Sequence, residues 1–220
     1  MPPALGQVRC TADGVESESR YENVHVVGAN LGRLTASQVE VEASRLERVD
    51  LTGAQLTGLA IRDVIVERGD VSNAVAYESR LTRSEFRGVR MTGAAIIDSV
   101  LADVLFEEVK FDLAGFRSSR FRRVEFRGCN LTRADFVGAD IGGATFVDCD
   151  LSGAQFSHVK AGAVGSRSGA RFENCRLDGI GGVTSLRGAS MTSHDVVGLT
   201  RVFAAELGIE IVDQSDGPFG

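Results

Sequence analysis

The sequence has little of the aromatic, proline and cysteine content that many compact folds use. Among 220 residues there is no tryptophan, and there are only two tyrosines, three prolines and four cysteines. The cysteines match neither a C-x-x-C metal pattern nor a compact disulfide framework, which favours a reduced compartment. No apolar run approaches the ~20 residues that a membrane-spanning helix needs. The first ten residues have neither the basic nor the apolar region of a signal peptide, so we expect a cytoplasmic protein.

An excess of positive charge is also missing. Lysine and arginine number 24 against 30 aspartates and glutamates, a net charge of −6. A protein that binds the phosphate backbone directly needs a basic surface to displace counterions. We therefore expect no direct contact with nucleic acid and none with a membrane.

Candidate catalytic and metal-binding residues are equally sparse. His25, His158 and His194 lie in separate segments, where no two of them can share a metal, and no nucleophile accompanies them. We assign no catalytic, cofactor-binding or metal-ligating residue, and we expect no enzymatic activity.

What the chain does contain is a repeat of five residues. Every fifth residue from Tyr21 to Ala161 is apolar, a run of 29 positions. Chance would produce such a run from this 43% apolar composition with a probability of ~10⁻¹¹. A second column, two residues earlier, is mostly small and carries no charge from Ser19 to Val159. All charges in this part of the chain fall on the other three positions.

A period of five with two inward positions fits neither a helix nor a plain strand. It requires a chain that turns a corner once per repeat, so that four repeats form a square coil of about 20 residues. Glycine often follows two residues after the central apolar residue, as at Gly28 and Gly53. We expect the corner there, because glycine tolerates an unusual φ.

The coil length predicts that residues 20 apart stack in the interior. Phenylalanines recur at this spacing and should form two inward ladders. The first ladder contains Phe86, Phe106, Phe126 and Phe146, and the second contains Phe116, Phe136 and Phe156. Cys129 and Cys149 are also 20 apart, in the small column, and are expected to be structural thiols.

Several segments resemble one known family. Residues 29–33 (ANLGR), 134–138 (ADFVG) and 149–153 (CDLSG) are similar to the A(D/N)LXX repeat of pentapeptide-repeat proteins. The resemblance covers residues 19–193 and implies an all-β solenoid, a right-handed quadrilateral β-helix of about 8 to 9 coils. The pattern is interrupted at 162–169, where we expect a small protruding loop. It resumes one step late at Phe172 and slips back near residues 180–183.

The two ends depart from the repeat. Residues 1–18 are predicted to form an N-terminal cap, and residues 194–220 a capping helix, a short strand and a tail. Thr192 or Ser193 is a good N-cap, and Gly208 a good helix stop. This segment either plugs the last coil or also forms a homodimer, as such segments do in related DNA-mimicking family members. The candidate residues are Val196, Leu199, Phe203, Leu207, Ile209 and Ile211.

The resemblance implies a function in protein binding. Our first hypothesis is a non-catalytic scaffold that binds a partner protein through its rod-like surface. The alternative is a DNA-mimicking binder of DNA gyrase or another type II topoisomerase, which would protect against antibiotics that target it. The family includes acidic rods of this kind that protect against quinolones.

Charge patterning separates these hypotheses. We number the four faces of the coil by their central residues, 21, 26, 31 and 36, in steps of 20. Over residues 19–158 the faces carry formal charges of +1, −2, 0 and −2, so none is strongly acidic. Asp63, Arg83, Asp103 and Arg123 alternate in sign along the first face, which weakens a DNA-like potential. Two acidic groups remain candidates for partner binding: Asp103, Glu107, Glu108 and Asp112 in one coil, and Glu78 with Asp98.

Overall fold

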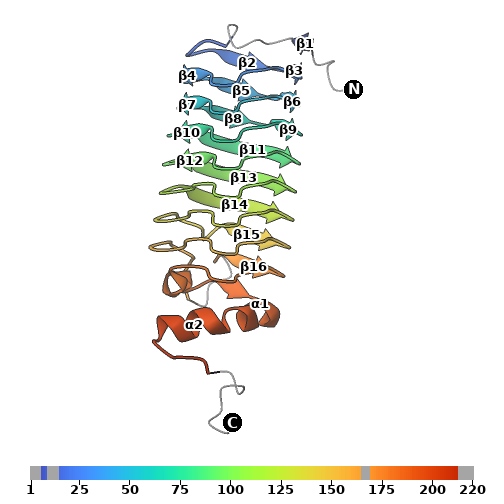
Figure 1. The fold of residues 1–220 in the computed structure, drawn as a ribbon. Helices are drawn as coiled ribbons and strands as arrows, with labels where there is room; N and C mark the ends of the chain where they lie inside the picture. Colours follow the sequence, from blue (N-terminus) through green and yellow to red (C-terminus); the bar gives the residue numbers. More distant parts are fainter. Residues whose placement is uncertain (1–5, 9–14, 165–168, 213–220) are drawn as a thin grey trace.

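The chain winds into an elongated, four-sided, right-handed β-helix of about eight turns, as the repeat predicted (Figure 1). A computed structural model describes residues 6–8, 15–164 and 169–212. The first coils lie at one end of the rod and the short helices α1 and α2 at the other. The predicted fold class is therefore confirmed.

The strands are short because each coil has four corners. The described residues form seventeen: β1 (Gly6–Val8), β2 (Arg20–Glu22), β3 (Val24–Val27), β4 (Thr35–Ser37), β5 (Glu40–Glu42), β6 (Arg45–Glu47), β7 (Gln55–Thr57), β8 (Ala60–Arg62), β9 (Ile65–Glu67), β10 (Val75–Tyr77), β11 (Arg80–Arg87), β12 (Ala95–Ile97), β13 (Val100–Glu107), β14 (Arg120–Arg127), β15 (Ala144–Val147), β16 (Arg171–Glu173) and β17 (Ser190–Met191). All are paired in parallel, almost always with the strand 20 residues away.

Two sheets form the walls of the rod. The first and second faces share a 13-stranded sheet, in which β11, β13 and β14 each cover both faces. The fourth face has a separate sheet of four strands, in the order β12-β10-β7-β4. The third face is held by isolated bridges such as Asn30↔Asp50 and Asp50↔Asp70.

The corners have a left-handed backbone whether or not the residue is glycine. Every fifth residue from Glu18 to His158, except Gly143, has a φ between +47° and +73°. Non-glycine residues such as Arg33 and Asp63 adopt it as well, at +59° and +54°. Hydrogen bonds between coils fix this conformation, for example from the Arg33 N–H to the Thr52 carbonyl at 2.8 Å. Glycine at the corner was therefore a correct signal, but the fold does not require it.

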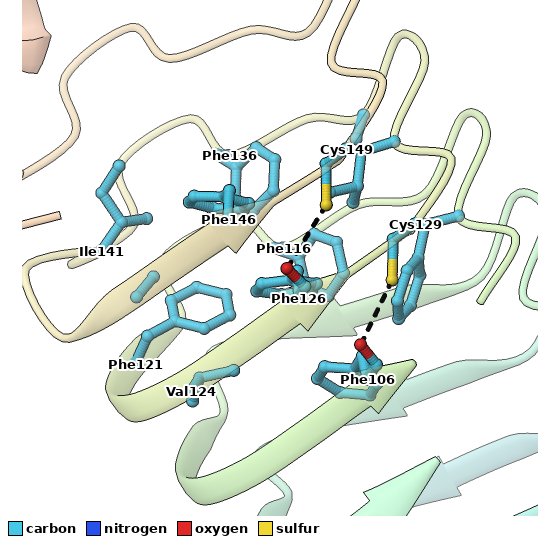
Figure 2. Close-up of a cluster of buried hydrophobic side chains, with 14 of the residues drawn as sticks. Phe106, Phe116, Phe121, Val124, Phe126, Cys129, Phe136, Ile141, Phe146 and Cys149 are labelled. Carbon is cyan, nitrogen blue, oxygen red and sulfur yellow. Dashed lines mark hydrogen bonds between the residues drawn. The ribbon is translucent and has the colours of Figure 1, made fainter. Parts of the chain in front are cut away.

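The phenylalanines stack in two ladders inside the second half of the rod (Figure 2). On the second face, ring centroids from Phe86 to Phe146 are separated by 4.9–5.0 Å. Phe172 continues this ladder at 4.9 Å, and the fourth-face ladder from Phe116 to Phe156 has spacings of 5.0 and 5.1 Å. Phe106, Phe126 and Phe146 are fully buried.

The interruption near 162–169 lengthens one coil. Phe146 pairs with Phe172, a separation of 26 residues, and Phe172 then pairs with Met191, 19 residues further on. The predicted loop falls partly on residues 165–168, which lie outside the described part. The 3-10 helix η2 (Val183–Leu186) follows.

The C-terminal end contains two short helices, α1 (Ser193–Gly198) and α2 (Thr200–Glu206), which meet at Leu199. Thr192 is the N-cap and forms a capping box with Asp195. Gly208, with φ +70°, ends α2 as expected, and the Ile209 N–H donates to the Ala204 carbonyl at 2.8 Å.

The predicted short strand at Ile209 and Ile211 is wrong. Residues 209–212 are not part of a strand, and both isoleucines are exposed, by 57% and 46%. Alternating apolar residues favour a strand only where a neighbouring strand can pair with them. The last strand of the ladder is β17, which lies on the other side of α1 and α2 in the sequence.

Candidate interaction surface

Many outward carboxylates and amides are used by the backbone of their own coil. Asp50, Asp70, Asn130 and Asp150 precede the central residue of a third-face repeat, and each accepts the N–H two residues further on at 2.8–3.0 Å. This Asx turn explains why the repeat favours aspartate or asparagine at that position. Such carboxylates stabilise turns, which makes them poor candidates for binding a partner.

Two of the four carboxylates in the predicted acidic cluster on coil residues 103–112, Asp103 and Glu107, lie beside arginines. Asp103 accepts two hydrogen bonds from Arg123, at 2.5 and 2.7 Å, and Arg123 thereby lowers the pKa of Asp103. Glu107 lies 3.6 Å from Arg87. Asp112 accepts the Thr92 hydroxyl at 2.8 Å.

The alternation of charge on the first face forms pairs between coils. Arg83 donates two hydrogen bonds to Asp63, both of 2.7 Å, just as Arg123 does to Asp103. On the second face, Arg127 turns instead to Glu125 in its own strand. These pairs reduce the negative potential along the rod.

Glu78, Asp98 and Glu108 are the exposed candidates without an ion pair, and Asp112, which also has none, is half-buried. Within the described residues, none of the three exposed side chains forms an ion pair with a lysine, arginine or histidine. All three occupy corner positions with left-handed φ, between +49° and +54°. Glu78 and Asp98 belong to successive coils of the fourth face, whereas Glu108 lies on the second.

An outward tyrosine lies beside the fourth-face pair. Tyr77 is 39% exposed, and the negative charges of Glu78 and Asp98 raise the pKa of its hydroxyl above the usual value. In strands β10 and β12, Tyr77 pairs with Ile97, and Val75 with Ala95.

These side chains form what we call the fourth-face patch. It combines an apolar surface with two carboxylates that have no basic partner and hydrogen-bond with the Tyr77 hydroxyl, and its members are Val75, Tyr77, Glu78, Ala95, Ile97 and Asp98. Among residues 35–98 of this face, Glu78 and Asp98 are the only charged residues. Sequence reasoning identified the two acids but missed Tyr77. The available signal was an aromatic residue at an outward position of the repeat.

The C-terminal candidates divide into one buried residue and five exposed ones. Leu199 is fully buried and packs against the hydrophobic core. The other five are exposed by 41–73%: Val196, Phe203, Leu207, Ile209 and Ile211. The expectation that these five cap the last coil is therefore wrong, because their side chains are exposed instead of packing against it as Leu199 does. A dimer through them remains a prediction.

The end of the coil is closed by a polar contact that sequence reasoning did not find. The carboxylate of Asp195, 1% exposed, accepts the backbone N–H of Cys175 at 2.7 Å. Serines of the small inward column receive the same bond inside the rod, where the Ser79 N–H donates to the Ser99 hydroxyl at 2.9 Å. Asp195 thus takes the place of the next coil's inward residue.

The cysteines belong to the same column. Cys129, Cys149 and Cys175 are buried and unbridged, and each thiol lies 3.4 Å from the carbonyl of a ladder phenylalanine. Figure 2 shows this contact for Cys129 and Cys149. Its hydrogen bond with Cys129, together with burial, raises the pKa of Cys149 to about 12. The same hydrogen bond lowers the pKa of Cys129, but burial keeps all three thiols away from reagents in the folded protein. Cys10 lies outside the described residues.

In the described ranges, no three histidine, cysteine, aspartate or glutamate side chains are placed to hold a metal ion. No helix there is long and apolar enough to cross a membrane. An apolar cavity lies inside the first coils, lined by residues such as Val26, Leu46 and Leu56.

Comparison with known proteins agrees with this architecture. Residues 79–156 match a family model described as a pentapeptide repeat region. The molecule is thus a β-helix built from five-residue repeats. Residues 79–156 of this β-helix are a pentapeptide repeat region. No curated protein sequence matches it.

Solved structures similar to the chain include other repeat proteins. A trypsin-treated variant of QnrB1, a plasmid-mediated fluoroquinolone resistance protein, is 17% identical, with coverage of 90% of this chain and 93% of that one and a TM-score of 0.39. HetL, involved in heterocyst differentiation regulation in the cyanobacterium Nostoc sp. strain PCC 7120, is 18% identical, with coverage of 79% and 87% and a TM-score of 0.30.

Proposed function

We propose that this repeat-protein scaffold is a non-catalytic protein-binding rod and that it contacts its partner through the fourth-face patch. The observation that carries this proposal is the pairing of carboxylates. Asp103 and Glu107 lie beside arginines, whereas Glu78 and Asp98 lie exposed beside Tyr77 and Ile97. Exposed apolar groups next to unpaired charges are typical of interaction sites.

The partner surface follows from this chemistry. The apolar side chains of β10 and β12 favour an apolar contact at the centre, and Glu78 and Asp98 at its edge favour a lysine or arginine. The rod holds these groups at fixed positions because both strands pair along their whole length. Such a preorganised surface binds with little loss of side-chain entropy.

A photo-crosslinking amino acid in place of Ile97 tests the proposal in the cells that produce the protein. We expect one dominant adduct, which Asp98→Lys should reduce at least several-fold because it reverses the charge facing a basic partner. Glu108→Lys is the matched control, since Glu108 is also an exposed, unpaired corner residue but lies on another face. Equal loss in both variants, or no adduct, contradicts the proposed site.

The gyrase hypothesis is the second candidate. Its support is the family resemblance together with the rod shape, and the paired carboxylates of the first and second faces count against it. A supercoiling assay with purified DNA gyrase, with and without a fluoroquinolone, tests it directly. Gyrase binding through the patch is supported if the protein inhibits gyrase or protects it from the drug. Asp98→Lys should then weaken this effect, and Glu108→Lys should preserve it. If the unsubstituted protein has no effect with or without the drug, the gyrase hypothesis is excluded and a rod that binds another partner protein remains.

A further inference from the structure

The interior of the first four coils is incompletely filled. Two cavities of about 90 and 70 Å³ lie there. Both are lined by Leu46, Leu51, Leu56, Leu59 and Ile61, so they are neighbours along the axis of the rod.

Sequence explains why the cavities lie in this half. The coil that contains Ile61 has Val66, Val71 and Ala76 at its other three central positions. Three coils later, the equivalent positions are Phe121, Phe126, Leu131 and Phe136. The same backbone encloses both sets, because parallel strands keep the same spacing. The smaller side chains therefore leave space that the rings fill elsewhere.

Side-chain exposure shows the same difference. Leu31, Leu56 and Ile61 face inward but keep 8% exposure, and Leu46 and Val71 are only partly buried. Leu101, Phe106, Phe116 and Leu131 have none. The inward side chains of the first coils touch a void, whereas those of the later coils touch each other.

Water is a poor occupant of this space. The cavities are lined almost wholly by hydrocarbon side chains, and a buried water requires two to four polar partners. The backbone offers few, because its N–H and carbonyl groups bond from coil to coil, as from Leu51 N–H to the Asp70 carbonyl at 2.7 Å. Apolar cavities of this kind stay dry and accept apolar guests.

We propose that the first four coils contain an internal binding site for small molecules that have no hydrogen-bonding group. An apolar cavity of about 150 Å³ accepts benzene or xenon. The two cavities here are smaller, which selects guests below the size of benzene, such as xenon or a short hydrocarbon. This site is inside the rod and is independent of the fourth-face patch.

Xenon titration of the methyl-labelled protein, followed by NMR, tests the site. We expect the methyl signals of Leu31, Leu56 and Ile96 to shift progressively with xenon pressure. The signals of Leu131, Ile141 and Leu151, which are fully buried in the later coils, should stay in place. Absence of shifts, or equal shifts in both halves, overturns the proposal.

A substitution separates the two cavities. Val66 lines only the second one and pairs with Phe86, so Val66→Phe adds a ring at the start of the second-face ladder. We expect it to abolish the xenon shifts at Met91 and Ile96 and to preserve those at Val26 and Leu31, which line only the first cavity.

The control is Val147→Phe, the same exchange at an outward position of the same face. It should leave every xenon shift unchanged. Persistence of the Met91 and Ile96 shifts in a folded Val66→Phe protein overturns the assignment of the second cavity. Should Val66→Phe not fold, the map of shifts in the unsubstituted protein decides the proposal.

Discussion

The two halves of the rod have the same backbone but different interiors. Coils up to about residue 98 are filled mainly with valine, leucine, isoleucine and alanine and contain the cavities, the second of which reaches Phe86 and Ile96. Later coils, from Phe106 to Phe172, are filled with stacked rings whose centroids lie about 5 Å apart. The comparison shows that hydrogen bonds between coils define the shape of this fold, whereas side-chain volume decides how well it is packed.

The largest difference between the halves should appear when a central side chain is truncated. Phe126→Ala removes a ring that contacts Phe106 and Phe146, and we expect a loss of about 3–5 kcal/mol in the free energy of unfolding. Leu46→Ala, on the same face, should cost less, about 2–3 kcal/mol, because Leu46 already borders a cavity. Denaturant unfolding measures both, and equal costs would contradict the comparison.

The closed end of the ring-packed half depends on Asp195. Asp195→Ala removes the acceptor for the buried Cys175 N–H and half of the capping box, so we expect a loss of about 2 kcal/mol. Asp195→Asn keeps an oxygen at the same place and serves as the control. A thermal melt that is unchanged in Asp195→Ala refutes the capping role.

Filling the loosely packed half should make it resemble the other. Val66→Phe extends the stacked ladder beyond Phe86 and occupies the smaller cavity, and we expect a gain of about 1 kcal/mol. Val147→Phe, which points outward, should change the melting temperature little. A destabilised Val66→Phe protein would mean that the cavity cannot hold the ring.

Buried thiols give a probe of the ring-packed half alone. In a Cys10→Ser protein we expect Cys129, Cys149 and Cys175 to react with a thiol reagent only on unfolding, since they are buried and the pKa of Cys149 is raised to about 12. The reaction rate should therefore follow the unfolding rate. Fast reaction under native conditions would show that this half opens independently.

The surfaces of the two halves should differ least. Arg83→Gln and Arg123→Gln each break one bidentate pair with an exposed aspartate, and we expect small and equal decreases in melting temperature. Arg123 lowers the pKa of Asp103 in the folded state, so its contribution is present above the unfolded pKa of an aspartate. It is lost as pH falls through the lower folded value. The melting difference should disappear in acid, and its persistence there would contradict this account.

Much of the fold could be read from the sequence, because the repeat is long and its two inward positions are chemically uniform. The ladders that contain Phe106 and Phe116 follow from the 20-residue coil alone. The ends were harder to predict. Ile209 and Ile211 alternate as in a strand, but no neighbouring strand pairs with them, and the five exposed apolar residues of this end do not cap the coil.

The sequence by itself determined the square coil, its inward columns and the alternating charges, since each follows from position within a five-residue period. The same period places Arg123 one coil from Asp103, and Asp98 one coil from Glu78. Only the tertiary structure decided which partner an arginine chooses, since Arg127 bonds Glu125 of its own strand rather than a residue of the neighbouring coil. The cavities and the contact of Asp195 with Cys175 likewise depend on side chains from different coils meeting in space, which a period along the chain does not describe.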